Sequence, residues 1–310
     1  MARSTMTTDR SSNSGVTAAI ATYTMWGLLP IYFKLLTAIP ALELVGWRII
    51  FTLPICLLVI VVLRQGDDLA AALANRAMVL RLGLSALLVG SNWVIYVSAV
   101  NAGHVLAASL GYYIIPLINV LIGTVFLRER LGRLQWLAVG VAAAGIALLA
   151  WEALDMLTVA LTLAVSFALY GYVRKVTPIG AVPGLTIETA WLLVPAICVA
   201  AWYGHQPAGS SMVLDWRLSL LLASTGLVTA VPLLLFAFAA RRMSLSALGF
   251  VQFISPTLGF LLGHFLYGEP LDGARTTCFV MIWIALALFC WDMLHKARMN
   301  AHSKAAAAAT

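Results

Sequence analysis

The stretch Gly111-Tyr-Tyr-Ile-Ile-Pro116-Leu-Ile-Asn-Val-Leu-Ile-Gly123 has a second copy, Phe253-Ile-Ser-Pro256-Thr-Leu-Gly-Phe-Leu-Leu-Gly263, whose proline and final glycine lie 140 residues further along the chain. Each copy is an apolar run with an internal proline, followed at matching spacing by a glutamate, Glu129 or Glu269. A fixed internal period is the signature of a duplicated structural unit. We therefore expect a helix break at Pro116 and again at Pro256.

The same offset extends well outside this stretch. It relates Lys34 to Arg174 and Trp151 to Trp291, so the register is kept from the beginning of one half to its end. This indicates two homologous repeats. The predicted organisation is a disordered tail over 1–15, a first repeat over 16–152, a second repeat over 153–294 and a disordered tail over 295–310.

The composition is that of an integral membrane protein. Of the 310 residues, 62% are hydrophobic and only 10% are charged, and the mean hydropathy is +0.97, whereas a soluble domain has about 25% charged residues. A helix needs about 20 apolar residues to cross a bilayer, and ten runs approach this length. They are 16–37, 41–63, 77–100, 103–127, 131–151, 154–173, 182–203, 217–239, 243–267 and 272–294. Between them, 64–76 could form a small amphipathic element.

The basic residues predict the orientation in the membrane, because Lys and Arg concentrate in cytoplasmic segments. Fifteen of the nineteen lie on the side of the N-terminus, three lie on the far side, and Arg48 lies within a span. Both termini are therefore expected in the cytoplasm, and the positive net charge reflects topology, not nucleic-acid binding. The fifteen are Arg3, Arg10, Arg64, Arg76, Arg81, Arg128, Arg130, Arg133, Arg174, Lys175, Arg241, Arg242, Lys296, Arg298 and Lys304.

Five spans per repeat is an odd number, so the second repeat should insert upside down relative to the first. Inverted repeats are the architecture of secondary transporters, whose binding site lies near the midplane between the halves. The alternative is a non-transporting scaffold for membrane assembly or lipid handling. Inverted symmetry lets a transporter alternate between inward-open and outward-open states, whereas it gives a scaffold little benefit. The sequence therefore favours transport.

No catalytic motif was found in the chain. It has no HExxH, GxSxG or GxxxxGK[ST] pattern, so no enzyme activity, metal or cofactor is expected. Transport would be driven by an ion or solute gradient. The expected partners are a small-molecule substrate and membrane lipids. Gly259 and Gly263 have GxxxG spacing, and Ala138, Ala142 and Gly145 form a small-residue face; both would suit a homodimer, or equally close packing within one chain.

Charged residues within spans are functional candidates, because burying a charge in a bilayer is costly. Four such residues are candidates for gating or ion coupling: Lys34, Glu43, Arg48 and Glu188. We expect Glu43 to meet Lys34 across the helix interface, as a gate, a proton site or a packed ion pair. Lys34 near a helix end could equally reach water. Proton coupling through Glu43 or Glu188 is a hypothesis.

Prolines and polar or aromatic side chains near them suggest where a substrate binds. Matched breaks in the two halves are the strongest sequence indication of a transporter site, although packing kinks would explain them too. The candidate lining residues favour an amphipathic organic solute, whereas ordinary helix packing is the alternative for each of them. They are Trp26, Asn92, Trp93, Tyr112, Asn119, Trp191 and Gln252. The cavity is expected between spans 1–4 and 6–9, with spans 5 and 10 peripheral.

Several local patterns resemble the EamA-type drug/metabolite transporter superfamily. They include Trp26-Gly27 with Pro30 and Lys34, Ser109-Leu-Gly-Tyr112 with Pro116, Glu129-Arg130, and Pro256-Thr with Tyr267-Gly-Glu269. A further set is similar to the RarD branch, which is associated by name with chloramphenicol sensitivity. It consists of Ser91-Asn-Trp93, Ala99-Val-Asn101, Gln135-Trp-Leu-Ala138, Leu169-Tyr-Gly171 with Arg174-Lys175, Ile187-Glu-Thr189 with Trp191-Leu-Leu193, and Leu248-Gly-Phe250 with Gln252.

This resemblance covers nearly the whole of 16–294. It implies a multi-pass permease of the bacterial inner membrane that exports small metabolites or drugs. Two positions depart from the branch pattern, with Ala108 where a glutamate is common and Ile115 where an asparagine is common. A role of that glutamate in binding protons or substrate would then fall to Glu43 or Glu188.

Overall fold

The computed structural model describes residues 2–102, 105–151, 154, 157–207, 209–213, 215–268 and 273–308. Over these residues the protein is helical, with nine helices long and apolar enough to cross a membrane and a shorter apolar helix, Ser109–Val125. The predicted all-α polytopic fold is confirmed. The helices are α1 (Ala2–Lys34), α2 (Ala41–Val62), α3 (Gly66–Ala74), α4 (Arg76–Asn101), α5 (Val105–Val125), α6 (Arg133–Trp151), α7 (Leu157–Val176), α8 (Ala181–Gly204), η2 (Ser211–Val213), α9 (Trp216–Ala240), α10 (Leu245–Gln252), α11 (Ile254–Tyr267) and α12 (Gly273–Ala308).

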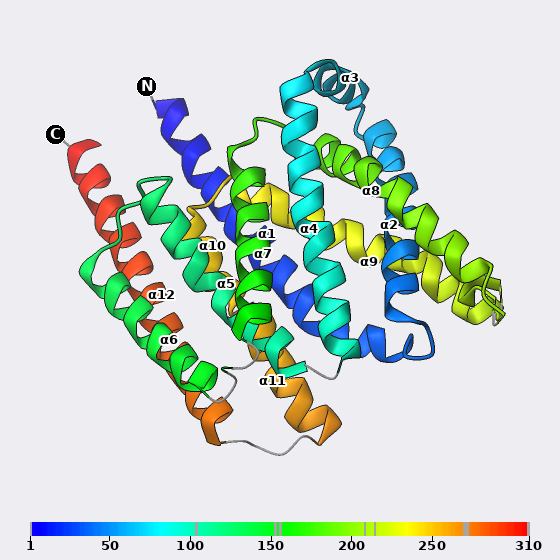
Figure 1. Cartoon of the computed structure of the whole chain (residues 1–310). Helices are drawn as coiled ribbons and strands as arrows, with labels where there is room; N and C mark the ends of the chain where they lie inside the picture. The colour runs from blue at the N-terminus through cyan, green and yellow to red at the C-terminus, as the bar shows by residue number, and fades with distance from the viewer. Residues whose placement is uncertain are drawn as a thin grey trace.

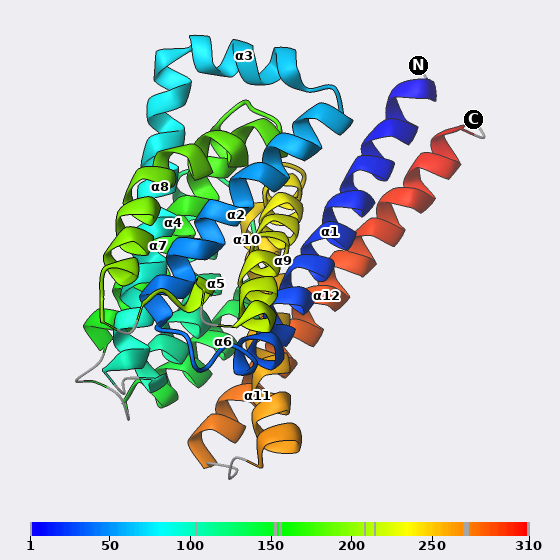
Figure 2. The same ribbon diagram turned by 90° about the vertical axis from the view of Figure 1, so that its right-hand side faces the viewer.

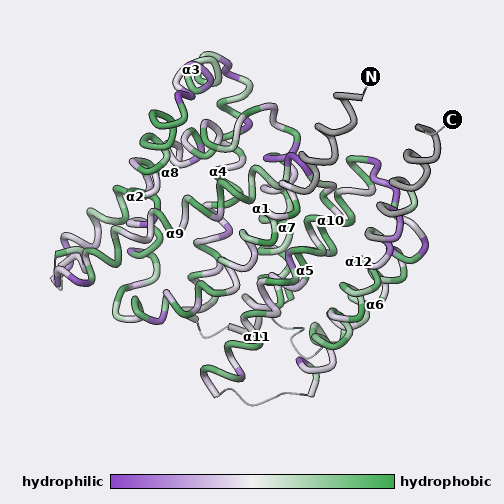
Figure 3. The backbone as a smooth tube through the Cα atoms, turned by 180° about the vertical axis from the view of Figure 1, so that it is seen from behind, coloured by the Kyte–Doolittle hydropathy of each residue, from purple (hydrophilic) through white to green (hydrophobic). Residues whose placement is uncertain are grey.

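Apolar residues cover the outside of the helices along their middle parts. Leu58, Val194 and Phe265 are exposed although each lies within a spanning helix. In Figure 3 the helices are largely green in their centres, and purple hydrophilic segments gather at α3 and at turns near the same end of the molecule. Such a surface suits lipid, because an apolar side chain gains nothing from water and hydrocarbon accepts it.

The helix boundaries keep the 140-residue offset. Four pairs of helices begin at Ala41 and Ala181, Arg76 and Trp216, Val105 and Leu245, and Arg133 and Gly273. Figure 1 shows that the C-terminal end of α5 lies at the same end as both termini and α3, whereas the C-terminal end of α11 lies at the opposite end. Corresponding segments of the two halves therefore point in opposite directions. The expected boundary between the halves, at 152–153, lies outside the described residues, as does Glu269.

Contacts between the halves follow the same symmetry. Helix α1 of the first half packs against α9 and α11 of the second half. Its counterpart α7, in the second half, packs against α4 and α5 of the first half. Three further contacts join counterparts directly: α2 with α8, α5 with α10, and α6 with α12. Figure 1 places α6 and α12 at one edge of the molecule, which matches the peripheral position expected for spans 5 and 10.

Proline breaks the chain less often than expected. α5 continues through Pro116, so the break predicted there is wrong, whereas the second copy is interrupted at Phe253, where α10 ends and α11 begins before Pro256. A proline removes one backbone hydrogen bond, which a helix supported by neighbouring helices can tolerate. The matched sequence therefore gives a continuous helix in one half and a broken one in the other.

The terminal segments also differ from expectation. We expected loose tails over 1–15 and 295–310, but α1 extends back to Ala2 and α12 extends to Ala308. Extending an existing helix requires no new nucleus, and alanine is the best helix former. The tails therefore continue the adjoining spans as helices.

The connection 64–76 forms the short helix α3. In Figure 2 this helix lies across the end of the bundle, roughly perpendicular to the spanning helices. Asp67 and Asp68 are exposed in its first turn, and Ala72 is buried in a small apolar cluster with Leu82, Ile179 and Ile187. The amphipathic element predicted here is confirmed.

The small-residue face of α6 is used within the chain. Ala138 and Ala142 are fully buried, and a Cβ placed on Gly145 would lie 3.0 Å from the Cβ of Met281 in α12. Small residues let helix backbones approach closely where no water drives association. This face therefore packs α6 against α12, while a Cβ on Gly259 of α11 would meet open space.

Candidate functional site

Arg48 lies about two turns into α2 and is surrounded by aromatic side chains. Its Nε atom donates a 3.0 Å hydrogen bond to Oγ1 of Thr229 in α9. Its guanidinium carbon lies 5.0 Å from the ring centre of Trp93 and 5.3 Å from that of Phe33. Cations over aromatic faces are attracted by the negative charge density of the ring. These contacts hold the guanidinium in one place while leaving the side chain only half-buried.

Tyrosines complete this surrounding. Tyr32, Tyr96 and Tyr112 lie close enough to interact electrostatically with Arg48, and the rings of Tyr96 and Tyr112 meet edge-to-face at 5.5 Å. Tyr96 is 38% exposed and Tyr112 is half-buried. We name Phe33, Trp93, Tyr96 and Tyr112, with Arg48 and Thr229, the Arg48 cluster. The cluster draws on α1, α2, α4, α5 and α9, and hence on both halves.

Within the part of the chain that the structure describes, Arg48 has no carboxylate at ion-pair distance. A cation at this depth is ordinarily paired or turned toward water, because an isolated charge in a bilayer is expensive. The Arg48 cluster is therefore a region with excess positive charge.

Glu188 is a second charged residue inside the bundle, on α8. It is 2% exposed, accepts a 2.6 Å hydrogen bond from Oγ of Ser85, and has an Oε1 atom 3.5 Å from Nη1 of Arg174. Its other oxygen has no hydrogen-bond partner, and neither have Nε and Nη1 of Arg174. The pair is thus electrostatically matched but incompletely hydrogen-bonded, which makes it costly to bury.

Gly184 makes room for Arg174. A Cβ at this position would clash with Nη1 of Arg174, so the guanidinium crosses α8 where the helix has no side chain. Arg174 also donates a 3.2 Å bond to the carbonyl of Ala181. Nearby, Arg241 donates to the carbonyl of Ile179. Burial, with the positive charges of Arg174 and Arg242, lowers the pKa of Arg241 from its ordinary value.

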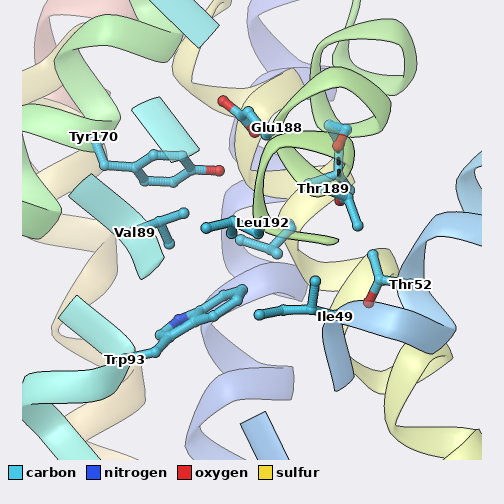
Figure 4. Close-up of a pocket in the computed structure, with 10 residues that line it drawn as sticks. Ile49, Thr52, Val89, Trp93, Tyr170, Glu188, Thr189 and Leu192 are labelled. Carbon is cyan, nitrogen blue, oxygen red and sulfur yellow. Dashed lines mark hydrogen bonds between the residues drawn. The ribbon is translucent and has the colours of Figure 1, made fainter. Parts of the chain in front are cut away.

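A small cavity lies between the Arg48 cluster and Glu188. Its volume is about 10 Å³, roughly the space of one water molecule. Figure 4 shows Trp93 on one side of this cavity, Glu188 on the other, and the Tyr170 hydroxyl pointing toward its centre. An organic solute could not pass at this level without rearrangement of the helices. The cavity is lined by Ile49, Thr52, Val89, Trp93, Tyr170, Leu185, Glu188, Thr189, Leu192 and Leu233.

Arg48 and Glu188 occupy equivalent positions of the two repeats, because they are 140 residues apart. From the sequence they were expected only as separate candidates. The same offset relates Lys34 to Arg174, the ion-pair partner of Glu188 that sequence reasoning assigned only to the cytoplasmic boundary. The Lys34–Arg174 relation was noted from the sequence, and applying the offset to every charged residue would also have found the Arg48–Glu188 relation. Thr229, Tyr96, Ser85 and Tyr170 carried no such signal.

The expected contact between Glu43 and Lys34 is wrong. Glu43 is fully buried and accepts hydrogen bonds from Ser210 Oγ at 2.6 Å, Ser211 Oγ at 2.7 Å, the Ser211 backbone N–H at 2.9 Å and Trp47 at 3.2 Å. Lys34 is exposed and lies 3.9 Å from the ring centre of Tyr267. Serine hydroxyls satisfy Glu43 without a second charge, and a lysine near a helix end readily reaches water. Glu43 therefore fastens the loop after α8 to α2.

At the end of the molecule that carries the termini, Glu129 contacts the start of α10. Glu129 accepts from the N–H groups of Leu245 at 2.6 Å and Ser246 at 2.9 Å, and from the Ser246 hydroxyl at 2.7 Å. A carboxylate at a helix N-terminus satisfies free N–H groups and the helix dipole. Lys175 donates to the carbonyls of Ala240 and Met243 in the preceding turn. The Glu129 contacts tie the first half to the second at this end, whereas Lys175 joins α7 to the turn before α10 within the second half.

The three predicted amide side chains lie in helix interfaces. Asn92 donates to the carbonyl of Leu163 at 2.8 Å and to Ser166 at 3.0 Å. Asn119 donates to Oε1 of Gln252 at 3.1 Å, and the hydroxyl of Tyr23 donates to the same oxygen at 3.4 Å. All three amides are almost fully buried. They join α4 to α7, and α1 and α5 to α10.

The predicted tryptophans separate into three environments. Trp93 lines the cavity and contacts Arg48. Trp26 is half-buried among Tyr23, Phe167 and Phe236, with ring centres 5.5 to 5.7 Å away. Trp191 is 48% exposed and lies against α4 where Gly83 leaves space. Of the predicted lining residues, the structure thus brings Trp93 and Tyr112 together with Arg48. Ile115 is fully buried, and the side chain of Ala108 lies outside the described part.

A larger hollow of about 590 Å³ opens between α1, α8 and α9, toward the end that carries the termini. Its lining is apolar or hydroxylated and contains no charged side chain: Ser14, Thr17, Ala18, Ala21, Ala181, Val182, Leu234, Leu235 and Phe238. It is separate from the Arg48 cluster, with which it shares no residue.

These features define a multi-pass membrane protein whose charged and aromatic groups converge between two related halves. The sequence profile of the EamA-like transporter family matches residues 13–151. A Vibrio cholerae protein named as an uncharacterized transporter is 41% identical over 94% of this chain and 98% of its own length. Protein RarD of Escherichia coli strain K12 is 42% identical over 93% of this chain and 98% of its own.

A solved crystal structure shares the fold, with a TM-score of 0.69, 19% identity, and coverage of 89% of this chain and 97% of that one. The sequence relatives settle the class. The chain belongs to the EamA-like transporter family, and within it to the RarD-like branch.

Proposed function

We propose that the protein is a secondary-active transporter that exports a small organic metabolite or drug across the bacterial inner membrane by alternating access. The observation that carries this proposal is the pair Arg48 and Glu188, which occupy equivalent positions of two oppositely oriented repeats. Glu188 lines a water-sized cavity, and Trp93, which contacts Arg48, lines it too. Midplane groups between inverted repeats are where secondary transporters bind solute. The relatives with named organisms are bacterial, and the distribution of basic residues supports a cytoplasmic position for both termini.

In this proposal the structure has its cytoplasmic side closed. Glu129 holds the start of α10, Lys175 holds the turn before it, and the Arg174–Glu188 pair closes the space between Trp93 and the cytoplasmic face. Opening toward the cytoplasm would separate these groups, while Glu43 and its serines hold the external side. Solute would then be exposed alternately to the two faces.

We further propose that protons drive this cycle through Glu188. It has one oxygen without a hydrogen-bond partner and lines the cavity, whereas Glu43 has four donors. A proton on Glu188 would remove the attraction that holds Arg174 in place. Proton relays in transporters use membrane-embedded carboxylates of this kind.

The test begins with metabolite and drug profiling of cells with and without the gene, followed by flux of each hit in proteoliposomes under an imposed pH gradient. We expect gradient-driven flux in the wild type, its loss in Glu188→Gln with solute exchange retained, and a pH response of Glu43→Gln like that of the wild type. Flux of both variants equal to wild type at every pH would exclude proton coupling. Absence of any solute flux would favour a non-transporting scaffold.

A further inference from the structure

The Arg48 guanidinium has more hydrogen-bonding capacity than the protein uses. Arginine has five N–H donors in a fixed planar arrangement, and the described contacts include one hydrogen bond, from Nε to Thr229. Trp93 and Phe33 contact the guanidinium through their rings, and these cation–π contacts do not replace hydrogen-bond acceptors for its N–H groups. The two terminal nitrogens are thus the part of Arg48 that remains available.

Other charged side chains inside the bundle are compensated differently. Glu188 has Arg174 and Ser85, Glu43 has two serines, and Lys175 has two backbone carbonyls. Arg48 has one neutral hydroxyl and the aromatic rings around it. It is also only half-buried, so part of its side chain stays at the accessible surface. This combination is what a binding site for a negatively charged group requires.

We propose that the transported solute is a small organic anion, whose carboxylate or phosphate binds the terminal nitrogens of Arg48 and whose apolar or aromatic body lies against Trp93 and Tyr112. This inference rests on the proposed transport function and names the substrate class of the same site. Thr229 fixes the guanidinium through Nε, so its outer edge faces the solute. Guanidinium groups bind carboxylates and phosphates through two parallel hydrogen bonds, which also fixes the orientation of the solute.

The surrounding rings fit the body of such a solute. Tyr96 and Tyr112 meet edge-to-face, and each is partly exposed. Aromatic and apolar walls with a few placed polar groups are typical of small-molecule sites. Their hydroxyls could also donate to an anion, whereas a cationic solute would be repelled by Arg48. The cluster therefore discriminates by charge first and by shape second.

The test measures binding of four radiolabelled probes to the full chain in lipid nanodiscs at neutral pH: phenylacetate, phenyl phosphate, the neutral phenylacetamide and the cationic phenethylamine. We expect wild type to bind at least one of the two anions about tenfold or more tightly than the neutral and cationic probes, because charge-assisted hydrogen bonds are lost in the others. The ratio between phenylacetate and phenyl phosphate distinguishes carboxylate from phosphate recognition.

Three variants make the test specific. Arg48→Gln should lose the preference for the anion by about tenfold to a hundredfold, and Arg48→Lys should keep part of it because the charge remains. Arg217→Gln is the matched control, since Arg217 is exposed and contacts Trp216 near the start of α9. It should bind like wild type. Size-exclusion profiles report folding, and should Arg48→Gln fail to fold, the charge preference of wild type and Arg48→Lys still decides.

The anion inference would be overturned if wild type bound neither anion more tightly than phenylacetamide, or if a folded Arg48→Gln variant kept the preference. Flux measured with the solutes found by metabolite profiling separates this from failure of the transport proposal. Flux of neutral or cationic solutes by wild type would reject the anion class and leave transport standing. Absence of all flux would reject transport itself.

Discussion

Arg48 and Glu188 occupy equivalent positions of the two repeats, but they differ in burial and in ionic partners. Arg48 is half-buried, lies among aromatic rings and has no carboxylate partner in the described residues, whereas Glu188 is buried and has Arg174 as an ion-pair partner. Duplication therefore preserved the place of a charge while its sign and partners diverged. The comparison suggests a division of labour, in which one position recognises the solute and the other couples transport to an ion.

The largest difference that we expect between the two positions is the side of the membrane to which each lies closer. Arg48 is near the start of α2 and Glu188 near the start of α8, and the proposed topology puts these ends on opposite faces. In a cysteine-free background, a membrane-impermeant maleimide should label His205→Cys in intact cells and leave Arg130→Cys unlabelled. Both positions are exposed. Permeabilised cells, in which both should react, are the control.

Equal labelling of Arg130→Cys and His205→Cys in intact cells would contradict the proposed topology. It would place the turns after α5 and α8 on one face of the membrane. The inverted relation between the two charged positions would then have to be abandoned.

The next largest difference should be in the free energy of unfolding that is lost when the charge at Arg48 or the ionic partner of Glu188 is removed. Arg174→Gln leaves Glu188 buried without its partner, which typically costs about 3–5 kcal/mol. Arg48→Gln removes a charge that has no ionic partner in the described residues, so we expect no comparable loss. Thermal unfolding in one detergent, with Arg217→Gln as control, gives the comparison. A similar loss in Arg174→Gln and Arg48→Gln would show that Arg48 is structurally paired after all.

A smaller effect should follow from filling the space beside Arg174. Gly184→Ala would place a methyl group against Nη1 of Arg174 and push the guanidinium from Glu188, with an overpacking cost of roughly 1–3 kcal/mol. Gly140→Ala is the matched control, because its Cβ would meet open space in α6. Alanine there should stabilise by about 0.5–1 kcal/mol, since glycine weakens a helix interior. Unfolding midpoints of the pair measure both, and equal shifts would argue against the crowding.

The smallest effect should come from Thr229→Val, which removes the hydrogen bond to Nε of Arg48. Losing one such bond costs about 1 kcal/mol, or roughly fivefold in the dissociation constant for the bound anion. Thr225→Val is the control, because Thr225 donates to Leu222 in the same helix. The binding assay with phenylacetate and phenyl phosphate measures both variants. Unchanged affinity in Thr229→Val would show that Thr229 does not orient the guanidinium.

Much of the architecture followed from local patterns. Apolar runs of spanning length predicted the helices, and the alignment of Pro116 with Pro256 gave the offset that the helix starts obey. The two prolines nevertheless behave differently, because α5 continues and α10 ends. Whether a helix tolerates a proline depends on the neighbouring helices that support the freed backbone groups, which a single stretch of sequence does not contain.

The candidate site was harder to predict. Asn92, Asn119 and Gln252 have the polarity of lining residues, yet their partners lie in other helices. Glu43 was expected beside Lys34, and serines that follow α8 occupy its oxygens instead. An amide or carboxylate in a span must find partners, but its type does not reveal which helix supplies them.

The sequence by itself determined the membrane class, the series of apolar helices, the duplicated register and the family, because hydropathy, charge placement and spacing can be read directly along the chain. The tertiary structure decided which charges meet, which prolines interrupt a helix, and that Arg48 is left among aromatic rings while Glu188 is paired. Those outcomes depend on contacts between helices far apart in the chain, such as Arg48 with Thr229 and Glu188 with Ser85. Only folding brings such residues within the few ångströms over which hydrogen bonds and ion pairs act.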